Sequence, residues 1–242
     1  MAESLATPQP CYNERLFAGG VRGRLHTARF RWLQGTLRRL DLKPDSVMEI
    51  GCYDGRAVEF LPQIPARYIG FDAGWENALQ LAAQRWAAQP HLEFRECLKA
   101  DQMNLNGEKF DLVMALETLE HIPPQDLGPY LETVAASLKP GGTFLVSVPN
   151  EIGPVFAAKH ILKVAFIGGY ETYSVREFIF ATLGMVEKVE RREHKGFSYR
   201  HLIKTLRQHF TVESARGIPF GFLPPYFNFG VGIVCHPKAK AS

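Results

Sequence analysis

The sequence predicts an α/β protein built on a seven-stranded, mostly parallel sheet with helices on both faces and an antiparallel last strand. Between residues 46 and 149, short apolar runs alternate with helical patterns, which favours parallel strands joined by crossover helices. After residue 151 the alternation gives way to helical segments, which we expect to form an insert after the fifth strand. The chain then ends on two further apolar runs, which favour an antiparallel edge.

Each element follows from its local pattern. Residues 26–40 place Phe30, Leu33, Leu37 and Leu40 at helical spacing and predict a cationic amphipathic helix. Apolar runs predict strands at 46–50, 67–71, 92–96, 109–116, 143–149, 210–216 and 229–237. Good helix formers, closed by Pro or Gly, predict helices at 55–62, 74–89, 124–142, 198–209 and within 151–185.

These elements suggest three parts. We expect an N-terminal helical cap at 1–43 and a main domain at 44–242, within which 151–197 forms a helical lid over the substrate. Residues 155–167 are amphipathic and could contact a membrane or a second subunit, but an ordinary lid helix is favoured. The sequence does not indicate an oligomeric state.

Composition excludes several classes of protein. The 242 residues are 46% hydrophobic and 22% charged, as in globular proteins. No run reaches the roughly 18 apolar residues of a membrane helix, and the first residues lack the apolar core of a secretory signal. The four cysteines are scattered and form no CxxC pair, which argues against a zinc cluster. Their scatter also fits a reducing compartment, so we expect a cytoplasmic protein. The net charge is +3, and the basic residues gather in two flanks, at 11–43 and 188–216. These flanks suit an anionic substrate, or they are solvated helix faces.

A glycine-containing loop marks the expected cofactor site. The stretch "EIGCYDG" places Glu49, Gly51 and Gly55 between a strand and a helix. Glycine is required where the backbone approaches a ligand closely or takes a positive φ. The loop lacks the GxGxxG pattern that seats a pyrophosphate, and a carboxylate beside it favours an ammonium group instead.

Together with "YIGFDAG", "FDLVMALETLEHI" and "LKPGGTFLVSVPN", this loop resembles the motifs of class I S-adenosylmethionine-dependent methyltransferases, which have a Rossmann-like fold. The resemblance covers about residues 45–150 and implies S-adenosyl-L-methionine as cofactor, with Asp72 accepting hydrogen bonds from its ribose. The residues it implies for cofactor binding are Glu49, Gly51, Cys52, Tyr53, Gly55, Asp72, Ala73, Leu98 and Leu116.

Two positions depart from the family pattern. Tyr53 stands where the family usually has its middle glycine, and its Cβ narrows the permitted backbone. Leu98 stands where an acid often lies near the adenine, so adenine would be held by apolar contact and backbone bonds. Alternatively, Cys97 and Leu98 are ordinary core residues.

A second group of polar residues follows the fourth predicted strand. If residues 117–121 form one helical turn, Glu117, Glu120 and His121 project from one face, where they suit a divalent cation such as Mg²⁺ or Mn²⁺. His194 is the candidate fourth ligand. This ExxEH pattern with a later histidine resembles the metal site of small-RNA 2′-O-methyltransferases, while a similar "LEH" occurs in quinone-biosynthesis O-methyltransferases. Without a metal, His121 would serve as general base, beside Glu120 as a second catalytic residue.

The acceptor stays open. The leading hypothesis is O-methylation of a hydroxyl on a small-molecule or glycan-type acceptor, such as a phosphate- or lipid-linked sugar of a bacterial surface polysaccharide. RNA 2′-O-methylation is less favoured because no RNA-binding module is visible. A quinone or other aromatic acceptor is the third hypothesis, since the aromatic residues of the C-terminal region would suit its pocket. A non-catalytic cofactor-binding protein is disfavoured by the intact glycine loop and Asp72.

Overall fold

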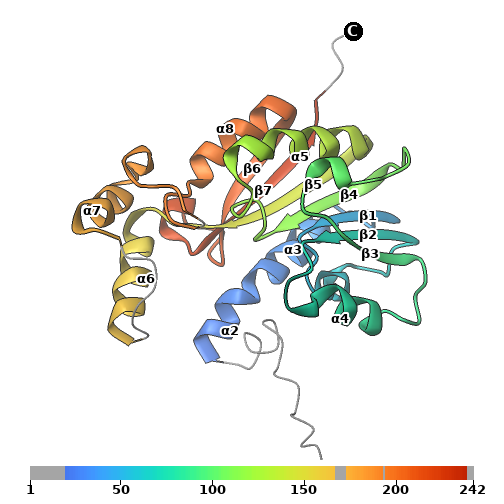
Figure 1. Cartoon of the computed structure of the whole chain (residues 1–242), viewed down its shortest axis with the longest axis horizontal. Helices are drawn as coiled ribbons and strands as arrows, with labels where there is room; N and C mark the ends of the chain where they lie inside the picture. The colour runs from blue at the N-terminus through green and yellow to red at the C-terminus, as the bar shows by residue number, and fades with distance from the viewer. Residues whose placement is uncertain (1–19, 167–172, 193, 239–242) are drawn as a thin grey trace, which may run out of the picture.

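The computed structural model describes residues 20–166, 173–192 and 194–238, which contain a twisted sheet with helices packed around it (Figure 1). The strands are β1 (Ser46–Ile50), β2 (Arg67–Asp72), β3 (Leu92–Glu96), β4 (Phe110–Leu116), β5 (Leu138–Pro149), β6 (Phe210–Ile218) and β7 (Gly230–Pro237). They lie in the order β3-β2-β1-β4-β5-β7-β6. β7 is antiparallel to both neighbours and the other pairs are parallel, as the sequence predicts.

Seven α-helices and five short 3₁₀ helices are present in the described residues. The α-helices are α2 (Gly20–His26), α3 (Ala28–Arg39), α4 (Ala78–Arg85), α5 (Pro124–Ser137), α6 (Gly153–Phe166), α7 (Val175–Leu183) and α8 (Tyr199–His209). The 3₁₀ helices are η1 (Arg56–Phe60), η2 (Trp75–Asn77), η3 (Ala100–Gln102), η4 (Val186–Lys188) and η5 (Pro225–Phe227).

The sheet separates two hydrophobic cores. Successive strand residues point to opposite faces, so Met48 belongs to a core that includes residues of α5 and α8, while Val47 belongs to a core that includes residues of α3 and η1. On α3, Leu33 is fully buried, which stabilises the fold by roughly 1.5–3 kcal/mol. These helices hold the loops at the carboxyl ends of the parallel strands, where ligands bind in open α/β sheets.

α6 and α7 pack together outside these two cores. A small separate cluster forms between them from Phe156, Ala181 and Val189, with Tyr173, Phe178 and Phe180 packed against it. α7 begins with a capping box, in which the side chains of Ser174 and Glu177 each accept a hydrogen bond from the backbone N–H of the other. The helix ends at Gly184, whose φ of +77° is left-handed. The helical insert predicted after strand five is therefore present; residues 167–172 of the predicted range lie outside the described residues.

The loop between β6 and β7 is fixed by two fully buried asparagines. Asn228 accepts a hydrogen bond from the Phe220 N–H at 2.8 Å through its side-chain oxygen and donates to the Phe220 carbonyl at 3.1 Å. Asn150, at the end of β5, donates to the Asn228 carbonyl at 2.9 Å. The loop is thereby held at the carboxyl edge, although Phe222 on it is 84% exposed.

Two predicted helices differ from the structure near the cofactor loop. The predicted helix 55–62 is the five-residue 3₁₀ helix η1, because Leu61 is extended (ψ 152°) before Pro62, which disfavours the α conformation. The predicted helix 74–89 starts as α4 at Ala78, because Glu76 and Asn77 have φ of +51° and +57°.

The boundary between α5 and β5 also differs from the prediction. The helix expected over 124–142 ends at Ser137, since Leu138 is extended and pairs with Phe110 of β4. β5 therefore begins five residues before the predicted strand, and Pro140 lies within it.

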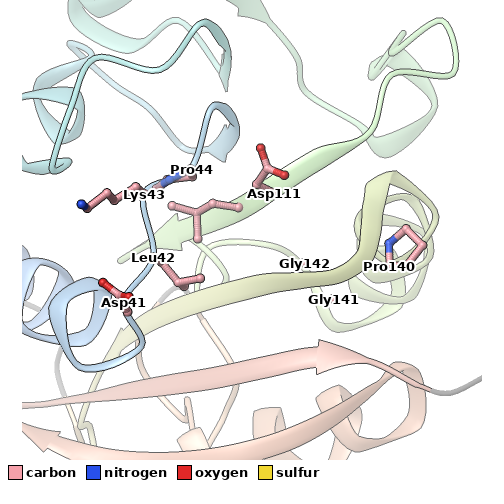
Figure 2. A pocket seen from close by; sticks show the side chains of 9 residues that line it. Asp41, Leu42, Lys43, Pro44, Asp111, Pro140, Gly141 and Gly142 are labelled. Carbon is pink, nitrogen blue, oxygen red and sulfur yellow. The ribbon is translucent and has the colours of Figure 1, made fainter.

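A shallow hollow lies at the opposite, amino-terminal edge of the sheet, away from Asp72 (Figure 2). It is lined by Asp41, Leu42, Lys43, Pro44, Asp111, Leu112, Pro140, Gly141 and Gly142. Within the described residues no helix is long and apolar enough to cross a bilayer.

Candidate active site

The loop after β1 contains two glycines with left-handed backbone conformations. Gly51 and Gly55 have φ of +76° and +68°. The N–H groups of Gly51 and Cys52 both donate to the Phe71 carbonyl, at 2.7 and 3.1 Å, which ties the loop to the end of β2. A Cβ on Gly55 would lie 2.7 Å from the Phe94 ring, so glycine is required there by packing as well as by φ.

Asp72 ends β2 beside this loop. Its carboxylate accepts hydrogen bonds from the N–H groups of Tyr53 at 2.9 Å and Gly74 at 3.0 Å. Partial burial raises its pKa, while these backbone hydrogen bonds lower it. The structure thus places the predicted ribose acceptor within reach of the predicted glycine loop.

Glu49 lies beneath the loop on β1 and is 2% exposed. The Tyr68 hydroxyl donates to its carboxyl group. Burial raises the pKa of Glu49 to about 8, although the hydrogen bond from Tyr68 opposes the shift. Glu49 is therefore largely protonated at neutral pH.

The other predicted cofactor residues surround this edge. Cys52 is buried and its side chain lies against Gly70, where a Cβ would clash with it. Ala73 is half-buried after Asp72, and Leu116 is buried at the end of β4. Leu98 is 59% exposed after β3, so it is not a core residue, whereas Cys97 is buried.

Arg29 on α3 is a site residue that the sequence analysis did not single out. Its positive charge lowers the pKa values of Glu49, Glu117 and Glu120, which places it among them. Its Nε is buried and has no hydrogen-bond partner among the described residues. A buried, unpaired guanidinium nitrogen suits a carboxylate such as that of a bound amino acid. The only local signal was its position on the cationic helix.

Glu117 does not lie where a helical turn would place it. Its φ is +57°, and residues 117–121 form a turn in which the His121 N–H donates to the Thr118 carbonyl at 3.0 Å. The expected helical turn is therefore wrong. The Glu117 carboxylate instead accepts a hydrogen bond from the Ser147 hydroxyl at 3.0 Å, and burial raises its pKa.

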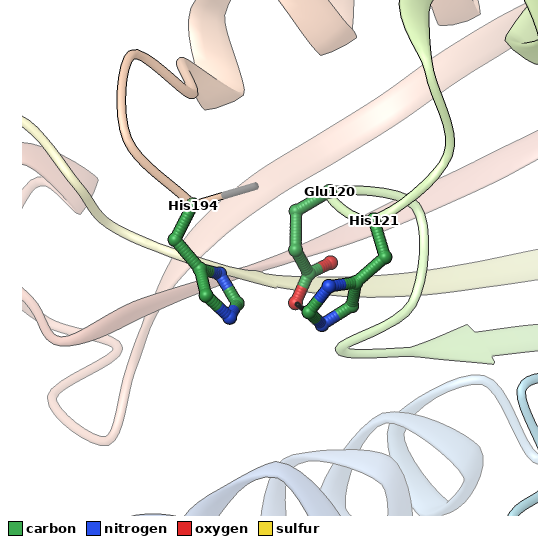
Figure 3. Close-up of side chains that lie close together, drawn as sticks. All are labelled: Glu120, His121 and His194. Atoms are coloured by element: carbon green, nitrogen blue, oxygen red, sulfur yellow. Dashed lines mark ion pairs between the residues drawn. The ribbon is translucent and has the colours of Figure 1, made fainter. Parts of the chain in front are cut away.

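Glu120, His121 and His194 lie on two loops that are far apart in the sequence, and their side chains point toward one another (Figure 3). One ligand atom from each lies within 4.8 Å of the others. The two imidazole rings meet edge to face with centroids 4.5 Å apart, and His121 Nε2 lies 3.9 Å from Glu120 Oε1. Three of the four predicted metal ligands are thus close together, and Glu117 is not part of that group.

Glu120 and His194 carry buried polar atoms that have no hydrogen-bond partner among the described residues. Glu120 is 1% exposed, and both of its carboxylate oxygens, like Nδ1 of His194, are buried without a hydrogen bond to any described residue. Burial, reinforced by the charge of Glu117, raises the pKa of Glu120 well above its usual value. Unpaired buried oxygen and imidazole nitrogen atoms form a donor set that a divalent cation fits.

A short hairpin positions His194. Arg192 and Lys195 exchange backbone hydrogen bonds of 3.1 and 2.9 Å on either side of it. The buried ammonium of Lys195 pairs with Glu177 of α7 at 2.8 Å, and Arg191 donates to the Glu120 carbonyl at 2.6 Å. Because these contacts join segments far apart in the chain, sequence reasoning did not find Arg191 and Lys195.

Comparison with known proteins shows the family of the chain. A family model described as a methyltransferase domain matches residues 24–212. The chain belongs to this methyltransferase family. This is the class of family that the sequence motifs imply.

Relatives of this methyltransferase agree with the assignment. The ubiquinone biosynthesis O-methyltransferase of Bradyrhizobium diazoefficiens is 35% identical over 124 residues, covering 48% of this chain and 47% of that protein. That of Nitrobacter winogradskyi is 34% identical over 123 residues, covering 48% of this chain and 45% of that protein. The chain spans about half the length of the curated relatives it matches.

Solved structures share the methyltransferase fold. An S-adenosylmethionine-dependent methyltransferase from Clostridium acetobutylicum superposes with a TM-score of 0.66 at 16% identity, covering 95% of this chain and 100% of that one. At such identity the likeness concerns the fold alone, and it confirms the predicted Rossmann-like architecture.

Proposed function

We propose that this methyltransferase transfers the methyl group of S-adenosylmethionine to a hydroxyl oxygen of a small aromatic acceptor, of phenol or hydroquinone type, bound beside Glu120, His121 and His194. The observation that carries the proposal is the pair of buried Glu120 oxygens, which have no hydrogen bond from the described residues and face two imidazoles. The names of the curated relatives, which are quinone-biosynthesis O-methyltransferases, support the choice of an aromatic hydroxyl.

Oxygen methylation requires a deprotonated or strongly polarised hydroxyl. The acceptor oxygen must lie about 3 Å from the methyl carbon and in line with the carbon–sulfur bond. As the bond to oxygen forms, the carbon–sulfur bond breaks, S-adenosylhomocysteine leaves, and the hydroxyl proton has to go to a base. His121, with 53% of its side chain exposed, is accessible to an acceptor and is the proposed base when no metal is bound.

Glu120, His121 and His194 are also the residues that would hold a divalent cation, with Mg²⁺ or Mn²⁺ matching the oxygen and imidazole donors. Such an ion lowers the pKa of a bound hydroxyl and fixes two neighbouring oxygens at once. Glu117, whose backbone is left-handed, would keep its hydrogen bond from the Ser147 hydroxyl and would not be a ligand of the cation.

The surrounding segments fit the proposed parts of the chain. We assign residues 151–197 to a lid, since α6 and α7 have their own small core and the segment carries His194. Residues 1–43 are assigned to a cap, of which the described part begins at residue 20 and contributes Arg29. The comparisons lend no support to the glycan or RNA acceptors that the sequence analysis considered.

The acceptor and the cation are tested together by assaying labelled S-adenosylmethionine with a panel of catechols, hydroquinones, sugar diols and short RNAs, with and without Mn²⁺ or EDTA. We expect methylated phenols, turnover that rises with Mn²⁺, and a loss of at least tenfold in His121→Ala and His194→Ala. His201→Ala, an exposed histidine of α8, is the matched control. Full activity in EDTA would remove the cation and leave His121 as base; methylation of sugars or RNA alone would overturn the aromatic acceptor.

Cofactor contacts need a separate test, because an inactive variant can fail at either site. Calorimetry with S-adenosylhomocysteine should show binding to the wild type and to His194→Ala, and at least tenfold weaker binding to Asp72→Ala. Unchanged affinity in Asp72→Ala would remove this residue from the cofactor site.

A further inference from the structure

Tyr53 replaces the usual middle glycine of the cofactor loop, and its side chain has a specific partner. Its hydroxyl donates a hydrogen bond of 2.8 Å to the Glu76 carboxylate. Tyr53 lies in the loop after β1, whereas Glu76 lies in η2 after β2. The contact therefore bridges two loops at the carboxyl edge of the sheet, where ligands bind in open α/β sheets.

Both ends of this hydrogen bond are conformationally unfavourable. Tyr53 and Glu76 have φ of +45° and +51°, in the left-handed region that favours glycine, and neither is Gly, Asn or Asp. Non-glycine residues persist in this region only where surrounding contacts determine them, and such residues cluster at ligand clamps and active sites. Two strained residues joined to each other by a side-chain hydrogen bond therefore point to a role in ligand binding.

Backbone contacts place this bridge over the ribose acceptor. The Tyr53 N–H donates to Asp72 at 2.9 Å, so the residue that contacts Glu76 through its side chain contacts Asp72 through its main chain. Only four positions separate Asp72 from Glu76. The bridge therefore lies beside the predicted ribose acceptor.

We propose that Tyr53 and Glu76 form a clasp over the nucleoside end of the cofactor, which retains S-adenosylmethionine and its demethylated product. The clasp must open for the nucleoside to enter or leave. Tyr53 is half-buried, Glu76 is exposed and neither belongs to a hydrophobic core, so opening requires the hydrogen bond to the carboxylate to break. A hydrogen bond to a charged group has a net strength that corresponds to roughly tenfold in a dissociation rate.

The test measures the release of S-adenosylhomocysteine by stopped flow, and its affinity by calorimetry, in the full chain. Tyr53→Phe keeps the ring and removes the hydroxyl, and Glu76→Ala removes the acceptor. We expect each to raise the dissociation rate about tenfold, and the double variant to add little, because both remove the same contact. Glu76→Gln, which keeps an acceptor oxygen, should recover part of the effect.

Tyr226→Phe is the matched control, because its hydroxyl donates to the Thr182 carbonyl within the lid and not near Asp72. Thermal unfolding of each variant shows whether it is folded, and Glu76→Ala remains informative if Tyr53→Phe is not. An unchanged dissociation rate in both single variants would overturn the clasp. Slower release or tighter binding in Tyr53→Phe would also overturn it, because the hydrogen bond to Glu76 would then oppose binding and not retain the ligand. Since only cofactor binding is measured, the result is independent of the proposed acceptor.

Discussion

Replacing Glu49 by glutamine tests the electrostatics of the cofactor loop without removing an atom from the buried site. The glutamine side chain would still accept the Tyr68 hydrogen bond, but it carries no charge at any pH. Glu49 has a pKa of about 8 in the folded chain against 4.5 for the ordinary side chain. Between these values the folded protein holds one more proton than the unfolded chain, so the wild type loses stability as pH rises.

The size of the effect follows from these two pKa values. One pKa unit corresponds to about 1.4 kcal/mol, so Glu49→Gln should be more stable than the wild type by less than about 1 kcal/mol at pH 5, about 3 kcal/mol at pH 7 and about 4 kcal/mol at pH 8. With a urea m-value of about 3 kcal/mol/M, the midpoint at pH 7 rises by about 1 M.

Urea unfolding of the cofactor-free protein at pH 5, 7 and 8 measures this difference. Glu132→Gln, which removes an exposed carboxylate from α5, is the control. A stability gap for Glu49→Gln that is equal at pH 5 and pH 8, or a wild type that is more stable at pH 8, would refute the assignment of a protonated Glu49.

Three further predictions concern other contacts. Asn228→Ala should lower the unfolding free energy by about 3 kcal/mol, since it leaves buried loop groups unpaired, and calorimetric melting would show a drop of several degrees. Arg29→Met should weaken S-adenosylhomocysteine binding about tenfold at pH 7.5 in calorimetry, because a buried cation is lost; equal affinity would contradict its role. The ion pair between Glu213 and His236 lowers the pKa of Glu213, so its contribution is present above the ordinary glutamate pKa and is lost as pH falls through the lowered one. Because the pair is partly exposed, Glu213→Gln should cost less than about 1 kcal/mol at pH 6 and nothing at pH 2, as measured by urea unfolding.

The sheet and the cofactor loop were predictable because their signals are local. Apolar runs mark the parallel strands, and Gly51 and Asp72 each follow such a run directly. Glu120, His121 and His194 were found from spacing and resemblance, since the motif itself names the residue types. The conformation of Glu117 was not, because a left-handed glutamate has no local signature.

Long-range contacts account for what the sequence missed. Arg29 enters the site because α3 packs on the sheet, and Lys195 holds the His194 hairpin because Glu177 of α7 lies beside it. The asparagines that fix the β6–β7 loop act across 78 positions, from Asn150 to Asn228. None of these pairings leaves a periodic pattern in the chain.

The separate small core between α6 and α7 has an evolutionary consequence. Because Phe156, Ala181 and Val189 pack with one another and belong to neither main core, substitutions among them alter the packing of α6 and α7 without changing the composition of either main core. The proposed lid can therefore diverge in sequence while the residues that pack on both faces of the sheet stay the same.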